Sequence, residues 1–404
     1  MREEKRHKLI LASTIAAYCL IGVEIIIMIS PFALYFYSVY GPILEFFSSS
    51  PYLSWTTEFF LPHMVFMDDP LILFISYFQV LMVIGLLLFL LAAIPLYYGR
   101  FTGKGVVQIS FYSKIRHPQY LFLAVSGFGL MLYWPRFMIL FMYVNMLFVY
   151  YLLARNEEWR MKQEAPESYE KYLRNTPMFI PGEPGAKIYR VLFGWIRPRG
   201  LGIFAAYLLT MTLALSLAAG IREYTVEHLP ISEQAGMVML PVFPRPEKEA
   251  REVAAALAAS PEVEARRAEL QPNLAYIFPG DYFLTAIVTD EDRRFSDDMI
   301  ERFPEVLEWH EHKFRGGLGK FFRIFYNFVS TLGSVPTNYD VERIVFVRVT
   351  DPQGESVEAD NLFKIGMRRE PVMIVDIDSA SHEMLSVITP SGQHKWGSMP
   401  MPTF

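Results

Sequence analysis

The chain has 404 residues, of which 52% are hydrophobic and 15% aromatic, and its mean hydropathy is +0.24. A net charge of −5 without a long basic stripe argues against a nucleic-acid partner. The single cysteine, Cys19, excludes an intrachain disulfide and a cysteine-based metal site. The composition favours an integral membrane protein over a soluble one.

Apolar stretches along the chain predict about five membrane spans, at residues 9–30, 71–97, 120–134, 137–153 and 201–219. A span needs roughly 20 apolar residues. The first stretch is too long for the core of a cleaved signal peptide, so it predicts an uncleaved signal anchor. The third is short and is joined to the fourth by the tight turn 134–136. We therefore expect these two to form a helical hairpin that is not fully extended across the membrane.

The charges of the loops predict the orientation of the spans. Residues 31–70 contain no Lys or Arg, whereas residues 98–119 and 155–199 are rich in both. Positively charged loops stay in the cytoplasm. We therefore expect an integral membrane protein, of the inner membrane if the source is bacterial, with a cytoplasmic N-terminus. An odd number of spans then places the tail from Ile221 outside the cytoplasm.

The tail differs in character from the rest of the chain. Prolines between residues 230 and 246 predict a linker, and residues 247–270 predict one exposed amphipathic helix. Apolar and polar residues alternate at 282–288, 343–349, 372–377 and 384–388, which predicts strands. The predicted fold is mainly α: a polytopic membrane helical bundle with a C-terminal extracytoplasmic α+β domain. Its predicted parts are residues 1–69 (anchor span and outer loop), 70–199 (membrane core with a cytoplasmic segment), 200–229 (last span and linker) and 230–404 (outer domain).

One ordered set of residues surrounds the predicted hairpin and carries the chemistry. Arg116-His117-Pro118-Gln119-Tyr120 opens the hairpin, and Glu157-Glu158 follows it. Next come Tyr169 and Tyr172, then the segment 176–181, Thr-Pro-Met-Phe-Ile-Pro, with Phe179 between two prolines. Ionisable groups at the ends of membrane helices are costly to keep, which makes a functional site the first hypothesis.

The same order of residues resembles that of the isoprenylcysteine carboxyl methyltransferase and phospholipid methyltransferase group of integral membrane enzymes. The resemblance covers about residues 70–185. It implies that S-adenosylmethionine binds on the cytoplasmic side and that a lipophilic substrate enters from the bilayer. Matching the family motif position by position gives the implied cofactor-binding residues: Tyr112, Arg116, His117, Tyr120, Glu157, Glu158, Tyr169, Tyr172 and Phe179.

The needs of that cofactor agree with these residue types. Its carboxylate calls for Arg, His or a helix N-terminus, its ribose diol for a carboxylate, and its adenine for aromatic walls. Methyl transfer requires mainly the positioning of two reactants and the exclusion of water. For a carboxylate substrate, Arg155 or Arg174 is the predicted orienting residue. Such a nucleophile needs no general base, so none is assigned.

Two departures from the family pattern keep other functions open. Phe122 and Ser110 stand where the family commonly has glycine. With the additional tail, they allow a non-catalytic subunit of a membrane complex that retains a methyltransferase-like core. A sterol-reductase-like enzyme that uses NADPH is a further alternative. His310 and His312 lack a third ligand at clear spacing, so no metal site is predicted. Expected partners are membrane lipids, the lipophilic substrate and a protein that binds the tail.

Overall fold

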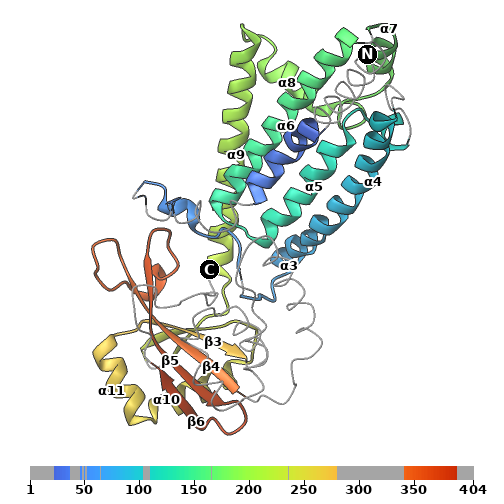
Figure 1. Ribbon diagram of the computed structural model, residues 1–404. Helices are drawn as coiled ribbons and strands as arrows, with labels where there is room; N and C mark the ends of the chain where they lie inside the picture. The colour runs from blue at the N-terminus through green and yellow to red at the C-terminus, as the bar shows by residue number, and fades with distance from the viewer. Residues whose placement is uncertain are drawn as a thin grey trace, which may run out of the picture. The chain divides into compact units, whose positions relative to one another are not determined.

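The computed structural model describes residues 22–36, 46–47, 50, 52–63, 65–102, 110–164, 166–234, 236–279 and 341–388 (Figure 1). The chain forms two compact units. The helical unit comprises Met1–Leu61 and Leu71–Arg222, and the sheet unit comprises Pro62–Pro70 and Glu223–Phe404. Residues 62–69, which the sequence predicts as the end of the N-terminal part, are therefore in the sheet unit together with Pro70. There the backbone N–H of Phe66 donates to the carbonyl of Val242 at 2.7 Å.

The helical unit holds an apolar helix at Gly22–Phe36 and a short 3-10 helix, η1 (Ser54–Thr57). The remaining helices are α3 (Pro70–Tyr77), η2 (Phe78–Val80), α4 (Leu81–Phe101), η3 (Ser110–Ser113), α5 (Pro118–Tyr133), α6 (Phe137–Glu164), α7 (Pro166–Asn175), α8 (Pro184–Phe193) and α9 (Arg199–Glu227). The tight turn between α5 and α6 makes them the predicted hairpin. Its backbone is fixed by the N–H of Phe137, which donates to the carbonyl of Glu58 at 3.1 Å.

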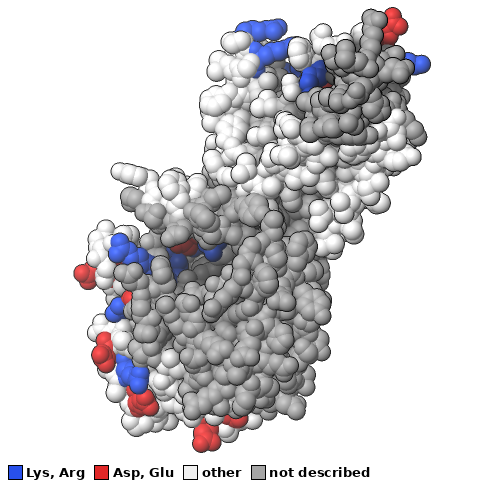
Figure 2. Space-filling model, in the orientation of Figure 1, with Lys and Arg blue, Asp and Glu red and all other residues white. Residues whose placement is uncertain are grey.

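Three helical stretches are long and apolar enough to cross a membrane: Pro70–Gly99, Phe137–Gln163 and Arg199–Glu227. They correspond to the second, fourth and fifth predicted spans. The third predicted span is the shorter helix α5, and the first is described only from Gly22 onward. On the face of the helical unit in Figure 2, the described Lys and Arg side chains lie at the end where α7 and α8 are found, beyond a broad uncharged surface. Three of the five predicted spans thus coincide with helices that have the length and composition needed to cross a membrane.

Helices α4 and α5 cross at very short distance because glycines lie at the contact. A Cβ built on Gly85 would overlap the backbone of Ser126, and one on Gly129 would overlap the backbone nitrogen of Met82. Small residues let helix backbones approach closely where the hydrophobic effect does not drive association. The Ser126 hydroxyl also donates to the carbonyl of Met82 at 2.8 Å.

We expect Gly129→Ala to lower the thermal unfolding temperature of the full-length protein in detergent by several degrees. Alanine is favoured over glycine in a helix by about 1 kcal/mol, but here α4 and α5 must separate to admit the methyl group. The matched control is Gly220→Ala on α9, where the added Cβ meets no atom within 4 Å. An equal or higher unfolding temperature in Gly129→Ala would contradict the close crossing.

The sheet unit contains one six-stranded sheet in the order β1-β2-β3-β4-β5-β6. The strands are β1 (Ser232–Gln234), β2 (Met237–Pro241), β3 (Leu274–Pro279), β4 (Val341–Thr350), β5 (Arg368–Asp378) and β6 (Met384–Ile388). Pairing is antiparallel except between β2 and β3, which are parallel. Parallel neighbours need a crossover, and α10 (Glu247–Ala258) and α11 (Pro261–Leu270) supply it. A short 3-10 helix, η4 (Ala359–Asn361), precedes β5.

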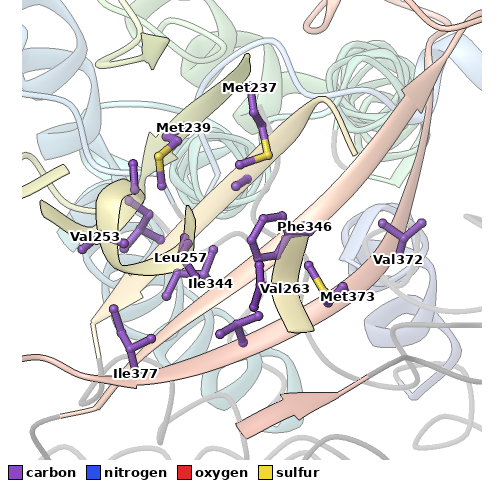
Figure 3. Packing of buried hydrophobic residues seen from close by; sticks show 14 residues of the cluster. Met237, Met239, Val253, Leu257, Val263, Ile344, Phe346, Val372, Met373 and Ile377 are labelled. Carbon is purple, nitrogen blue, oxygen red and sulfur yellow. The ribbon is translucent and has the colours of Figure 1, made fainter. Parts of the chain in front are cut away.

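The core of the sheet unit lies between these two helices and one face of the sheet (Figure 3). Alternate residues of each strand point toward the helices, as with Ile344 and Phe346 on β4. Val253 and Leu257 of α10 and Val263 of α11 meet them. This packing corrects the expected exposed helix at 247–270. The chain forms two helices, broken at Pro261, and each buries an apolar side.

Other expectations for the tail have mixed outcomes. The strands expected at 343–349, 372–377 and 384–388 are confirmed as parts of β4, β5 and β6. The expected linker between residues 230 and 246 is wrong, because β1 and β2 lie in it. The strand expected at 282–288 lies outside the described residues, as do His310 and His312.

Candidate functional site

Two segments far apart in sequence join at the start of α5. His117 is the N-cap residue of this helix, and Pro118 occupies its first turn, where the missing N–H costs nothing. The N–H of Arg116 donates to the carbonyl of Pro177 at 2.9 Å, and that of His117 donates to Met178 at 3.1 Å. The Arg-His-Pro segment and the loop after α7 are thereby held together.

Arg116 is the centre of the polar contacts at this junction. Its Nε lies 2.7 Å from Oε1 of Glu158, and its Nη2 lies 3.7 Å from Oε1 of Glu183. Its Nη1 donates to the carbonyls of Leu173, at 3.1 Å, and Thr176. The Arg116 side chain is only 9% exposed and that of Glu158 12%. Charge-assisted hydrogen bonds of this kind fix both the arginine and the end of α7.

His117 lies between the two adjacent glutamates. Its Nδ1 is 3.3 Å from Glu157 Oε2, and its Nε2 is 3.6 Å from Glu158 Oε1. Neither nitrogen makes a well-formed hydrogen bond, so the attraction is mainly electrostatic. Burial lowers the pKa of His117, but the two carboxylates outweigh it and the pKa is raised. Tyr120 stacks on the imidazole with ring centres 5.7 Å apart, and its hydroxyl donates to Glu157.

Three tyrosines form a layer behind these charges. The Tyr172 hydroxyl donates to the backbone carbonyl of Tyr112 at 2.6 Å, and the Tyr112 hydroxyl donates to Gln119 at 3.1 Å. Burial raises the pKa of Tyr172 to about 12, so its phenol keeps the proton that it donates. Tyr169 lies beside Tyr172, with ring centres 6.0 Å apart. The predicted cofactor residues of η3, α5, α6 and α7 therefore form one connected cluster.

A cavity of about 670 Å³ lies along one edge of this cluster. Its walls come from α6, the loop after α7, α8 and the start of α9. The lining residues are Arg116, Leu147, Phe148, Tyr151, Arg155, Glu158, Met178, Phe179, Ile180, Glu183, Pro184, Gly185, Ala186, Tyr189, Arg190, Arg199, Ile203 and Ala206. The volume is within the range of small-molecule sites, and most of the lining is apolar.

The structure divides the predicted site residues into two groups. Arg116, Arg155, Glu158 and Phe179 line the cavity. The others pack behind it and hold the first group in place: Tyr112, His117, Tyr120, Glu157, Tyr169 and Tyr172. Arg174 is not part of the lining; its side chain is 77% exposed and pairs with Glu170 one helical turn away.

Several lining residues were missed by the sequence analysis. Glu183 has a left-handed backbone, with φ 47°, and its carboxylate accepts the N–H of Met178 at 3.0 Å. Arg190 and Arg199 were used only as evidence for orientation. The sequence does contain a signal for both arginines. They lie just before the last apolar span and within about one helix length of the segment 176–181.

The two departures from the family pattern have separate structural explanations. Ser110 has φ 55°, a left-handed backbone that glycine adopts most easily, so the local shape persists without glycine. Phe122 is buried and packs edge-on against Phe111, with ring centres 4.9 Å apart. Phe122 therefore fills the core behind η3 and does not line the cavity.

The raised pKa of His117 predicts a pH-dependent stability. A group whose pKa is higher in the folded than in the unfolded protein stabilises the fold below its unfolded value, about 6.5. This stabilisation is lost as the pH rises through the pKa that His117 has in the folded protein. We expect the unfolding temperature of the wild type to fall over this interval and that of His117→Asn to change less. His228→Gln, which alters an exposed histidine, is the control and should follow the wild type.

Comparison with models of protein families, with curated proteins and with solved structures found no match to this chain. Within the described part of the chain, no group of three or more His, Cys, Asp or Glu residues is arranged to hold a metal ion.

Proposed function

We propose that this protein is an integral membrane methyltransferase that uses S-adenosylmethionine and acts on a lipophilic substrate. An isoprenoid or prenylcysteine carboxylate and a phospholipid amine are the candidate substrate classes. One observation carries the proposal: Arg116 and Glu158, which the methyltransferase-like motif supplies, meet at the wall of a ligand-sized cavity at the end of α6. The other side of that cavity is apolar and belongs to candidate membrane spans.

The lining fits the chemical groups of the cofactor. Glu158 and Glu183 offer carboxylates for a ribose diol, and Phe179 and Tyr151 offer aromatic walls for adenine. The cationic sulfur of S-adenosylmethionine is compatible with the same carboxylates. When bound, the cofactor supplies an electrophilic methyl group, whose carbon–sulfur bond breaks as the new bond to the nucleophile forms.

The residues of this chain have positioning roles in that reaction. Arg116 holds Glu158 in place, and the imidazole of His117 lies between Glu157 and Glu158. Arg155, on the cavity wall, is placed to orient an anionic substrate group, whereas Arg174 is not. The resulting rate gain comes from orientation and from the exclusion of water. A carboxylate nucleophile carries its own lone pair and needs no base from the protein, whereas the ammonium group of a phospholipid would first have to release a proton to water.

A lipophilic substrate has a matching surface in the cavity. Leu147 and Phe148 of α6 and Ile203 and Ala206 of α9 all line it. Both helices are long enough to span the bilayer, so a hydrocarbon tail lying between them would remain in contact with lipid. With the basic loops on the cytoplasmic side, the cofactor would bind from the cytoplasm. The sheet unit would then lie outside, as a module for a protein partner.

The proposal is tested by titrating S-adenosylmethionine into the purified full-length protein and following the heat of binding. We expect Glu158→Gln and His117→Ala to abolish binding, because the first removes a lining carboxylate and the second removes the imidazole that lies against it. Glu170→Gln, on the exposed side of α7, should bind as the wild type does. Undiminished binding in both site variants would count against the assignment.

A specific observation also favours a second candidate, a non-catalytic subunit with a methyltransferase-like core. Arg116 pairs with Glu158, and Tyr120 with Glu157, so these groups already satisfy one another. These contacts are sufficient for a purely structural role that involves no cofactor. Copurification of a fixed protein partner, together with failure to bind S-adenosylmethionine, would support this second function over the first.

A further inference from the structure

Three arginines from three different helices line the cavity. They are Arg155 of α6, Arg190 of α8 and Arg199 of α9. Among the residues that the structure describes, none of the three has an acidic group within ion-pair distance. Both glutamates of the lining, Glu158 and Glu183, are instead directed to Arg116. The cavity therefore has an excess of positive charge.

Two helix N-termini reinforce this excess. The first turn of α8 contributes Pro184, Gly185 and Ala186 to the lining, and α9 begins with Arg199 at the cavity wall. The start of a helix carries partial positive charge and free N–H groups, which favour a bound anion. The arginines and helix starts thus converge on the same space.

The position of α8 indicates where the anion comes from. Ile188 and Val191 of α8 and Trp195, just after its end, are 59%, 79% and 78% exposed, although all are apolar. Basic residues share this helix, and it leads within a few residues into the candidate span α9. Such a helix is typical of one that lies in the membrane interface, with its apolar side in the lipid. The mouth of the cavity is then at the level of lipid headgroups.

We propose that Arg155, Arg190 and Arg199 form a subsite for the phosphate of a phospholipid or another lipid phosphate, whose tail lies between α6 and α9. A planar carboxylate is satisfied by one bidentate arginine, whereas a phosphate presents oxygens in several directions and suits guanidinium groups from separate helices. The proposal rests on the proposed function in taking this lipid as the substrate of the same cavity. Arg190 and Arg199 lie beyond the stretch that resembles the methyltransferases.

The alternative explanation is that these are ordinary basic residues at the membrane boundary. Lys187 and Arg197 provide a direct comparison, because they are exposed on the same stretch but do not line the cavity. Diffuse attraction to anionic lipid depends on the number of charges and not on which ones are removed. A built subsite depends on the identity of the residues.

The test uses delipidated full-length protein and native mass spectrometry with dioctanoyl phosphatidic acid, octanoic acid or inorganic phosphate. For phosphatidic acid, we expect Arg190→Gln with Arg199→Gln to weaken binding by about tenfold or more per guanidinium lost. Lys187→Gln with Arg197→Gln should leave it unchanged. An equal loss in this control pair would overturn the subsite, as would equally tight binding of octanoic acid. Equally tight binding of inorganic phosphate would overturn the assignment to a lipid.

Titration with S-adenosylmethionine separates this inference from the proposed function. The Arg190→Gln with Arg199→Gln variant should keep the cofactor affinity of the wild type. Loss of cofactor binding with unchanged lipid binding would assign the arginines to the cofactor carboxylate and overturn the lipid subsite. A wild type that binds phosphatidic acid but not S-adenosylmethionine would refute the methyltransferase and leave the subsite standing.

Discussion

Arg116→Ala is expected to destabilise the helical unit by about 3–5 kcal/mol and to abolish binding of S-adenosylmethionine. The substitution leaves the carboxylate of Glu158 buried without its partner, and it removes the donor to the carbonyls of Leu173 and Thr176. The end of α7 then loses its attachment to the start of α5. Thermal unfolding followed by tryptophan fluorescence gives the first effect, and titration calorimetry gives the second.

A double replacement separates structure from function at this position. Arg116→Met combined with Glu158→Leu should recover much of the lost stability, because well-packed apolar residues can replace a buried ion pair. It should not recover cofactor binding. Arg174→Ala, which breaks an exposed pair on α7, should change stability by less than about 1 kcal/mol. If Arg116→Ala unfolds like the wild type, the central role of Arg116 is wrong.

The second large effect is expected in the sheet unit, where Arg343 of β4 and Asp376 of β5 face each other. Their atoms approach to 2.6 and 2.8 Å in a bidentate contact, and both side chains are fully buried. The Ser386 hydroxyl also donates to Asp376 at 2.9 Å. Arg343→Ala should lower the free energy of unfolding of the sheet unit by about 3–5 kcal/mol, because it leaves the buried carboxylate of Asp376 without its arginine partner. Hydrogen exchange of the β4 and β5 amides in the full-length protein measures the loss.

The same two strands provide the control. Arg348 and Glu370 are also cross-strand partners, 2.6 Å apart, but their side chains are 40% and 39% exposed. Arg348→Ala should therefore change the free energy of opening, measured by exchange of the β4 and β5 amides, by less than about 1 kcal/mol. If the two substitutions prove equally mild, the buried pair contributes nothing beyond a surface pair, contrary to this account.

The broad organisation of the chain was predictable from the sequence because its signals are local. Long apolar runs gave α4, α6 and α9, and the short turn before α6 gave the hairpin. An antiparallel hairpin returns the chain to its starting level, which places Glu158 near Arg116. The strand expected at 384–388 coincides with β6.

Other features depend on tertiary structure and left weaker signals. Strand β2 is buried at every position, so its sequence is a continuous apolar run without the alternation that marks a half-exposed strand. Helices α10 and α11 separate at Pro261, where Ser260 caps the second helix. A single helix is the prediction for this stretch because Ala, Glu and Arg are abundant on both sides of the break.

The internal pairing of the site was likewise beyond sequence reasoning. The motif suggested that Arg116 and Glu158 both face a cofactor, but their contact depends on the register between α5 and α6, which periodicity does not determine. Glu183 lines the cavity from a left-handed backbone conformation, which the sequence does not predict for a glutamate. Arg190 and Arg199 reach the cavity only because α8 and α9 fold back toward α6.

The most direct measurement is the transfer of a tritiated methyl group from S-adenosylmethionine to lipid extracted from membranes that contain the full-length protein. The account predicts radioactive label in the organic phase with the wild type and none with Glu158→Gln, although both proteins are folded. If folded wild type transfers no label to lipid, whether from its own membranes or added, the proposed methyltransferase activity is contradicted.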